Sequence, residues 1–96
     1  MKSALTAVEI EHFSKDHPEW TLQGGKLVRE WSFKDFVAAM KFVNHIAAIA
    51  EAGGHHPDID IRYNRVLLAL VSHDAGGITE RDIAMASRIT VAFPAP

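Results

Sequence analysis

Two adjacent histidines, His55 and His56, lie between a glycine pair and Pro57 in the segment EAGGHHPDIDIRY. A third, His73, follows at the end of the next apolar run. Histidine is the side chain whose ordinary pKa lies nearest neutrality, so these rings can donate, accept or bind a metal ion at physiological pH. General acid–base catalysis is most efficient when the pKa of the catalyst lies near the working pH. The three histidines are therefore candidate acid–base residues, and the alternative is that they are polar loop residues.

Metal binding is a second chemical use of the same residues, because three histidines can hold zinc and leave one position open. Neighbouring residues of an extended segment point to opposite sides, which argues against His55 and His56 as ligands of one ion. The sequence contains no cysteine, so thiolate sites and disulfides are excluded. We therefore expect an acid–base site without a metal.

Two carboxylates and a tryptophan are further candidates. Asp82 lies three residues after Thr79 and can cap the start of a helix, which stabilises it by about 1 kcal/mol. The same carboxylate could also orient His73 or an imidazolium. Glu51 is either a surface residue at the end of a helix or a hydrogen-bond partner of the histidine pair. Trp20 suits a core or rim position as well as a surface on which a ring could stack.

Alternating helical and extended segments must position these residues. The segment Thr6–Glu9 (TAVE) has the form of a capping box, which predicts a first helix running to about Lys15. Next, Gly24-Gly25 joins the runs WTLQ and KLVREWSF. Glycine pairs supply the positive φ of tight turns, so this segment is predicted to be a β-hairpin.

A long helix is predicted from Ser32, a candidate N-cap with Asp35 three residues later, to Gly53-Gly54. Its main apolar stripe consists of Phe33, Phe36, Val37, Met40, Val43, Ala47 and Ala50. Three further apolar residues are Phe42, Ile46 and Ile49. These three widen the apolar face beyond one contact surface, so they predict a second partner surface.

A second hairpin is predicted around Asn64-Arg65, between the runs IDIRY and VLLALVSH. With that turn, Ile61 would lie opposite Leu68 and His56 opposite His73. The register would bring the histidine pair and His73 to the same end of one hairpin. The run VLLALV is apolar on both faces, which predicts an interior strand covered on both sides.

A last helix is predicted from Thr79, the start of a second capping pattern (TERD), to about Phe93. The order of the elements is then α-ββ-α-ββ-α. We expect an α+β fold in which a single-layer antiparallel four-stranded sheet packs with three helices. The length of 96 residues is that of one domain, over residues 1–96.

Composition narrows the classes of function. With 48% hydrophobic and 23% charged residues, the chain has the composition of an ordinary soluble globular domain. A net charge of -2 without a basic cluster argues against binding to nucleic acid or anionic lipid. The chain has no apolar run of the roughly 18 residues that a membrane span needs and no signal-peptide pattern at its N-terminus. We therefore expect a cytoplasmic protein without a membrane partner.

The spacing of Glu51, His55-His56-Pro57, Tyr63, His73 and Asp82 resembles that of the pterin-4a-carbinolamine dehydratases. The resemblance covers nearly the whole chain: WSFKDFVAAMKFV is similar to the family's central helix, YNRVLLALVSH to its second hairpin and GITERDIAMASRI to its closing helix. Trp20 occupies the place of an aromatic that often begins the family's sheet. Two departures are the GG loop before the histidines and a loosely similar N-terminal segment.

The resemblance implies dehydration of 4a-hydroxytetrahydrobiopterin to the quinonoid dihydropterin, a step in tetrahydropterin recycling. In this reaction an acid protonates the leaving hydroxyl and a base removes a proton from the ring system. From this motif and the hairpin register we predict that His55 and His73 transfer the protons while His56 binds and orients the ring. Glu51, Asp82 and Trp20 would bind or orient the substrate.

The resemblance further implies that no cofactor is used, because water leaves and nothing is oxidised. The partners that it implies are a pterin substrate, further copies of the chain in a homodimer or homotetramer, and a functional link to an aromatic amino acid hydroxylase. The alternative to the enzyme is a non-catalytic dimerisation or assembly module of the same fold. A module without the chemistry would have no reason to carry all three histidines, so the sequence favours the enzyme.

Overall fold

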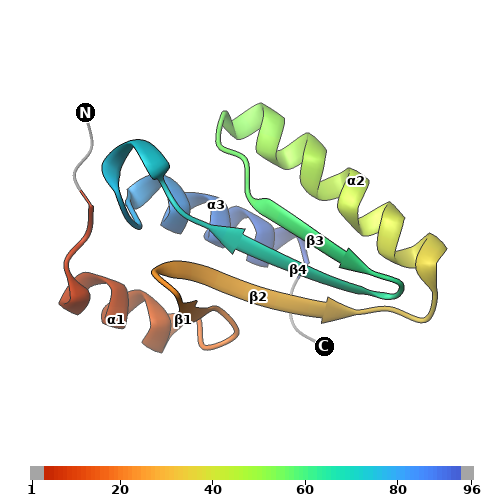
Figure 1. Ribbon diagram of the computed structural model, residues 1–96, viewed down its shortest axis with the longest axis horizontal. Coiled ribbons are helices and arrows are strands. Elements are labelled where there is room, and N and C mark those ends of the chain that lie inside the picture. The colour runs from red at the N-terminus through yellow and green to blue at the C-terminus, as the bar shows by residue number, and fades with distance from the viewer. Residues whose placement is uncertain (1–3, 94–96) are drawn as a thin grey trace.

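The computed structural model describes residues 4–93. Within these residues, helices and antiparallel strands follow one another in the order α-ββ-α-ββ-α (Figure 1), as predicted. The helices are α1 (Ala7–Asp16), α2 (Phe36–Gly53) and α3 (Glu80–Ala92), and a short 3-10 helix, η1 (His73–Ala75), precedes α3. The strands are β1 (Thr21–Gln23), β2 (Lys26–Ser32), β3 (Asp58–Arg62) and β4 (Arg65–Leu70). Between residues 4 and 93, no helix is long and apolar enough to cross a membrane.

Side-chain caps set the starts of the helices. The Thr6 hydroxyl accepts the Glu9 N–H at 3.2 Å, and the Glu9 carboxylate accepts the Thr6 N–H at 2.9 Å, so the predicted capping box at α1 is confirmed. The N-cap of α2 is Asp35, whose carboxylate accepts the Ala38 N–H at 2.8 Å. The prediction that Ser32 caps this helix is wrong, because Ser32 is the last residue of β2.

The second hairpin turns one residue earlier than predicted. Its turn residues are Tyr63 and Asn64, and Ile61 pairs with Val66 instead of Leu68. Tyr63 takes a left-handed φ of 53°, a conformation that is uncommon for a bulky residue. The backbone carbonyl of Asn64 accepts the Phe33 N–H, and its side-chain amide donates to the Phe33 carbonyl, both at 2.8 Å. These contacts with a distant segment hold the turn at this position.

The corrected register leaves His56 and His73 at the same end of the hairpin, as predicted, but not opposite each other. The pairing of β3 with β4 begins at Asp58 and Ala69, so His56 precedes the paired region. His73 lies in η1, beyond the end of β4. The predicted pair of His56 and His73 is therefore wrong.

The strand β4 lies between β2 and β3 in the sheet order β1-β2-β4-β3, so its predicted interior position is confirmed. Its residues Val66, Leu68 and Leu70 are fully buried and pack with residues of all three helices. On the opposite face of β4, Leu67 is only partly buried. The prediction of cover on both faces is therefore wrong, because the helices cover one face of the sheet.

The long helix α2 is rotated relative to its predicted orientation. Phe42 and Ile46 lie in the core with exposures of 4% and 0%, and Ile49 packs against the core. Phe36 and Val37, which belong to the predicted core stripe, are 47% and 62% exposed. The assignment of a partner surface to Phe42, Ile46 and Ile49 is therefore wrong.

Candidate functional site

A hydrogen bond between His55 and Asp82 joins the end of α2 to the start of α3. Gly54 ends α2 in the left-handed conformation with φ 66°, and the His55 N–H then donates to the Ala50 carbonyl at 3.3 Å. This turn directs the His55 ring inward, where its Nε2 lies 2.5 Å from Asp82 Oδ1. The His55 side chain is 13% exposed and that of Asp82 is completely buried. One nearly buried histidine is therefore held by a buried carboxylate.

The Asp82 carboxylate accepts hydrogen bonds on both oxygens. Its Oδ2 accepts the Ser72 hydroxyl at 2.8 Å and the Thr79 N–H at 2.9 Å, and the latter completes the capping box of α3. An ionised carboxylate has no proton to donate, so with Asp82 in this form the partner nitrogen, His55 Nε2, is the donor. Nδ1 is then the ring nitrogen of His55 that can exchange a proton with a substrate.

His56 forms a separate, exposed pair with Glu51. Its Nε2 lies 2.9 Å from Glu51 Oε1, and the two side chains are 64% and 77% exposed. Exposed pairs of this kind contribute little to stability. Figure 1 shows α2 running alongside β3, and an open pocket of about 360 Å³ between them is lined by Glu51, His56, Pro57, Ile59, Ala47 and Ala50. The pair therefore lies at the rim of a mainly apolar pocket, where it can bind a polar edge of a ligand.

His73 lies on a short exposed loop that begins beside the buried network. Ser72, which contacts Asp82, directly precedes it. The next residue, Asp74, accepts a 2.6 Å hydrogen bond from Arg81 at the start of α3. This hydrogen bond holds the pKa of Asp74 below its usual value and raises that of Arg81 above its usual value. The ion pair thus fastens the loop of His73 to the same helix that carries Asp82.

The prediction that Trp20 contacts the substrate is corrected by its burial. Trp20 is 1% exposed, and its indole N–H donates to the Thr90 hydroxyl at 2.9 Å. Its ring contacts the ring of Trp31 edge-on, with the two ring centroids 5.9 Å apart. No face of the indole is open for a second ring. Trp20 is therefore a core residue that fastens the first hairpin to α3.

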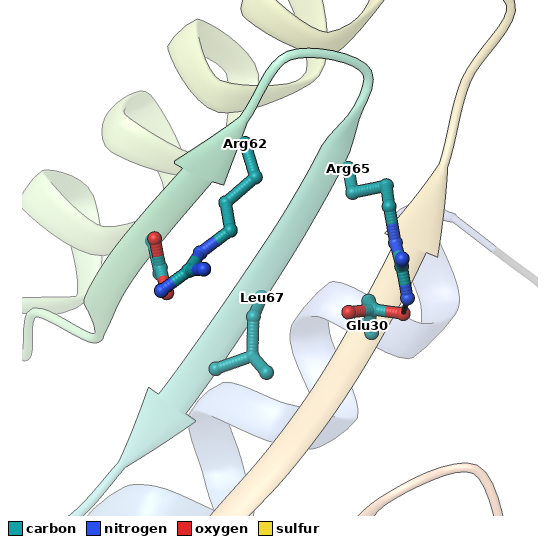
Figure 2. Close-up of a pocket in the computed structure, with 5 residues that line it drawn as sticks. Glu30, Arg62, Arg65 and Leu67 are labelled. Carbon is teal, nitrogen blue, oxygen red and sulfur yellow. Dashed lines mark hydrogen bonds and ion pairs between the residues drawn. The ribbon is translucent and has the colours of Figure 1, made fainter.

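A second pocket lies on the face of the sheet that the helices leave open. Figure 2 shows Glu30, Arg62, Arg65 and Leu67 on the near side of the strands, with helices behind them. Arg65 donates to Glu30 at 2.7 Å, which raises the pKa of Arg65 above its usual value. Arg62 donates to Asp60 at 3.4 Å. Each of these arginines is paired with a carboxylate, and the pocket lining contains no histidine, so the acid–base candidates lie elsewhere.

The structure also adds two residues to the site that the sequence did not indicate as polar partners. The hydroxyls of Ser72 and Thr79 lie 2.8 Å apart and are buried beside Asp82. Serine next to a histidine is too common to be a signal, and Thr79 was interpreted as a helix cap only. Within residues 4–93, no group of three or more histidine, aspartate or glutamate side chains is arranged to hold a metal ion.

Comparisons with known proteins identify the relatives of this chain. The family model described as pterin 4 alpha carbinolamine dehydratase matches residues 3–92. A protein of Thermomicrobium roseum, provisionally named a pterin-4-alpha-carbinolamine dehydratase, is 60% identical over 85 residues, which are 88% of this chain and 91% of the relative.

Two solved structures have the same fold. A transcriptional coactivator/pterin dehydratase from Brucella melitensis superposes with a TM-score of 0.84 at 34% identity, over 93% of this chain and 97% of that one. A pterin dehydratase-like protein described as a RuBisCO assembly factor of the alpha-carboxysome gives a TM-score of 0.67 at 25% identity. The match covers 83% of this chain and 95% of that one. From the extent of the family match and of the identities, this chain belongs to the pterin-4-alpha-carbinolamine dehydratase family.

Proposed function

We propose that the protein is a 4a-hydroxytetrahydropterin dehydratase, a hydro-lyase that acts on the carbinolamine of tetrahydrobiopterin or a related pterin. Membership of the family supports this proposal, as does the presence of all three histidines. The observation that carries it is the hydrogen bond that holds the His55 ring on the buried Asp82 carboxylate. An assembly module would not need a histidine oriented in this way.

The chemistry requires one acid and one base. As the C–O bond at the bridgehead carbon breaks, the hydroxyl takes a proton from an acid and leaves as water, while the adjacent ring nitrogen supplies the electron pair. A base then removes a proton from the ring system, and the product is the quinonoid dihydropterin. We assign the proton transfers to His55 and His73, and the binding and orientation of the ring to His56 with Glu51. Nothing is oxidised, so the step needs no redox cofactor.

A stopped-flow assay tests the proposal directly. The carbinolamine is generated and the loss of its ultraviolet absorbance is followed with and without micromolar protein. We expect faster decay that is proportional to the protein concentration and unchanged after prolonged treatment with a chelator. Decay at the spontaneous rate would refute the dehydratase function, and loss of the acceleration on chelation would refute the metal-free mechanism.

We further propose that the protein acts in the cytoplasm as a homodimer or homotetramer, together with an aromatic amino acid hydroxylase that supplies the carbinolamine. Support for an oligomer comes from exposed apolar side chains on α2 and on the neighbouring β3: Phe36 at 47%, Val37 at 62%, and Ile59 and Ile61 at 37% each. Clusters of exposed apolar residues usually mark interfaces, and symmetric association is the commonest way to cover one.

A charge placed on this apolar surface should weaken the oligomer. We expect Phe36→Lys to lower the mass measured by light scattering at micromolar concentration, towards the monomer mass of 10.6 kDa, because burying an unpaired ammonium group is costly. The control is Val8→Lys on α1, where the residue replaced is 63% exposed and lies outside the surface. A wild-type mass equal to the monomer would contradict the proposal, and so would equal effects of the two variants.

A further inference from the structure

Ser72 is a buried serine in the connection between β4 and η1, and neither the sequence motif nor the proposed reaction gives it a role. It is 2% exposed. Its hydroxyl oxygen lies 2.8 Å from Asp82 Oδ2 and 2.8 Å from the Thr79 hydroxyl oxygen. The hydroxyl and the His55 ring therefore contact different oxygens of the Asp82 carboxylate, since His55 contacts Oδ1.

The chemistry of the partners sets the direction of each hydrogen bond. The carboxylate oxygen can only accept, so Ser72 donates its one hydroxyl proton to Asp82. The Thr79 hydroxyl must then donate to the Ser72 oxygen, while its own oxygen accepts the Arg81 N–H at 3.2 Å. Each hydroxyl proton is used once. The result is an ordered chain of donors that ends on the carboxylate and leaves Oδ1 for His55.

The backbone of Ser72 is fixed as well. Its N–H donates to the Gly77 carbonyl at 3.0 Å, and the Gly77 N–H donates back at 3.3 Å. These two bonds close a loop that carries His73 directly after Ser72. Ser72 therefore connects the carboxylate partner of His55 to the base of the His73 loop.

We propose that Ser72 is a positioning residue that acts on both candidate acid–base histidines. Its hydroxyl holds the Asp82 carboxylate in the orientation that keeps the proton of His55 on Nε2 and leaves Nδ1 for the substrate. Its backbone holds the loop of His73 beside the same carboxylate. The catalytic consequence rests on the dehydratase function proposed above, whereas the effect on the His55 tautomer does not depend on it.

The proposal predicts a specific effect of removing the hydroxyl. In Ser72→Ala, Asp82 Oδ2 keeps only the Thr79 N–H, and the Thr79 hydroxyl loses its acceptor. The carboxylate is then less constrained, so we expect the fraction of His55 with its proton on Nε2 to fall. The expected kinetic result is a kcat about tenfold lower with KM changed less than about twofold. Ser72→Thr keeps the hydroxyl and should restore both the tautomer and kcat.

Nitrogen-15 spectra of the histidine rings measure the tautomer without any substrate. The protein is labelled at histidine and recorded near pH 8, where ordinary imidazoles are neutral, and His55→Gln identifies the signal. Ser87→Ala on α3 is the matched control, because Ser87 is half-buried and lines a pocket that contains no histidine. If Ser72→Ala has the wild-type His55 spectrum and the wild-type kcat, the proposal is wrong. It is equally wrong if Ser87→Ala shifts the spectrum as much.

A second variant tests the proposal if Ser72→Ala fails to fold. Ser72→Cys then replaces it, because a thiol has a similar shape and is a weaker donor. An unchanged His55 spectrum in Ser72→Cys would overturn the proposal. If the wild-type protein does not dehydrate the carbinolamine, the reaction assigned to it is wrong. A His55 tautomer that changes in Ser72→Ala and recovers in Ser72→Thr would still establish the positioning role.

Discussion

His55→Ala is expected to lower kcat by about 10²–10⁴-fold, the usual contribution of general acid–base catalysis. The His55 ring is nearly buried and is held by the completely buried Asp82, so its orientation is fixed before a substrate arrives. A ring that is already oriented contributes to the proton transfer more than to ground-state binding. The loss should therefore appear in kcat, with a smaller change in KM, in stopped-flow measurements over a range of carbinolamine concentrations.

Two other histidine variants are the controls for this result. His56 is exposed and paired with Glu51 at the rim of a pocket, so His56→Ala should mainly raise KM. His12 is exposed on α1, and His12→Ala should leave both constants unchanged. A His56→Ala variant whose loss lies wholly in kcat would contradict the division of roles between the two neighbouring rings, and a His55→Ala variant with normal kcat would exclude His55 from the proton transfers.

Asp82→Asn should reduce both stability and activity. The amide has the shape of the carboxylate, but it carries two N–H donors and only one acceptor oxygen. It cannot accept at once from Ser72, from the Thr79 N–H and from His55, as Asp82 does. Since Asp82 is completely buried, unsatisfied groups stay away from water, and we expect a loss of about 2–3 kcal/mol in the free energy of unfolding.

Urea unfolding and a double-mutant cycle separate the two effects of Asp82→Asn. Asp35→Asn is the matched stability control, because Asp35 caps α2 and asparagine caps as well as aspartate. If Asp82 acts through His55, adding Asp82→Asn to His55→Ala should cost little further kcat. Fully additive losses in kcat would show that Asp82 acts independently of His55, and equal stability of the two Asn variants would contradict the buried network.

Local signals predicted much of the fold. The capping boxes at Thr6 and Thr79 and the turn at Gly24-Gly25 depend on residues close together in the sequence, and each lies where it was expected. The turn of the second hairpin depends instead on contacts of Asn64 with Phe33, which lie far apart in the sequence. A shift of one residue in the turn then removed the predicted alignment of two histidines.

Which face of α2 turns towards the core also depends on contacts with segments that are distant in the sequence. The helix has apolar residues around most of its circumference, so its period allows more than one face towards the core. Packing against the sheet and α3 selects Phe42 and Ile46 and leaves Phe36 and Val37 outside. In the candidate site, the sequence predicted that Asp82 could cap α3 and also orient a histidine. That the partner is His55 depends on how α3 docks against the end of α2.

The aromatic cluster around Trp20 determines what an optical probe can report. Trp20 contacts Trp31, and Trp31 in turn contacts Phe42, which meets Phe93, the residue directly after α3, edge-on. Both tryptophans of the chain thus belong to one packed group that spans the first hairpin, α2 and the end of α3. Their intrinsic fluorescence will follow the docking of these elements, so a change in emission in a site variant would signal a disturbed core.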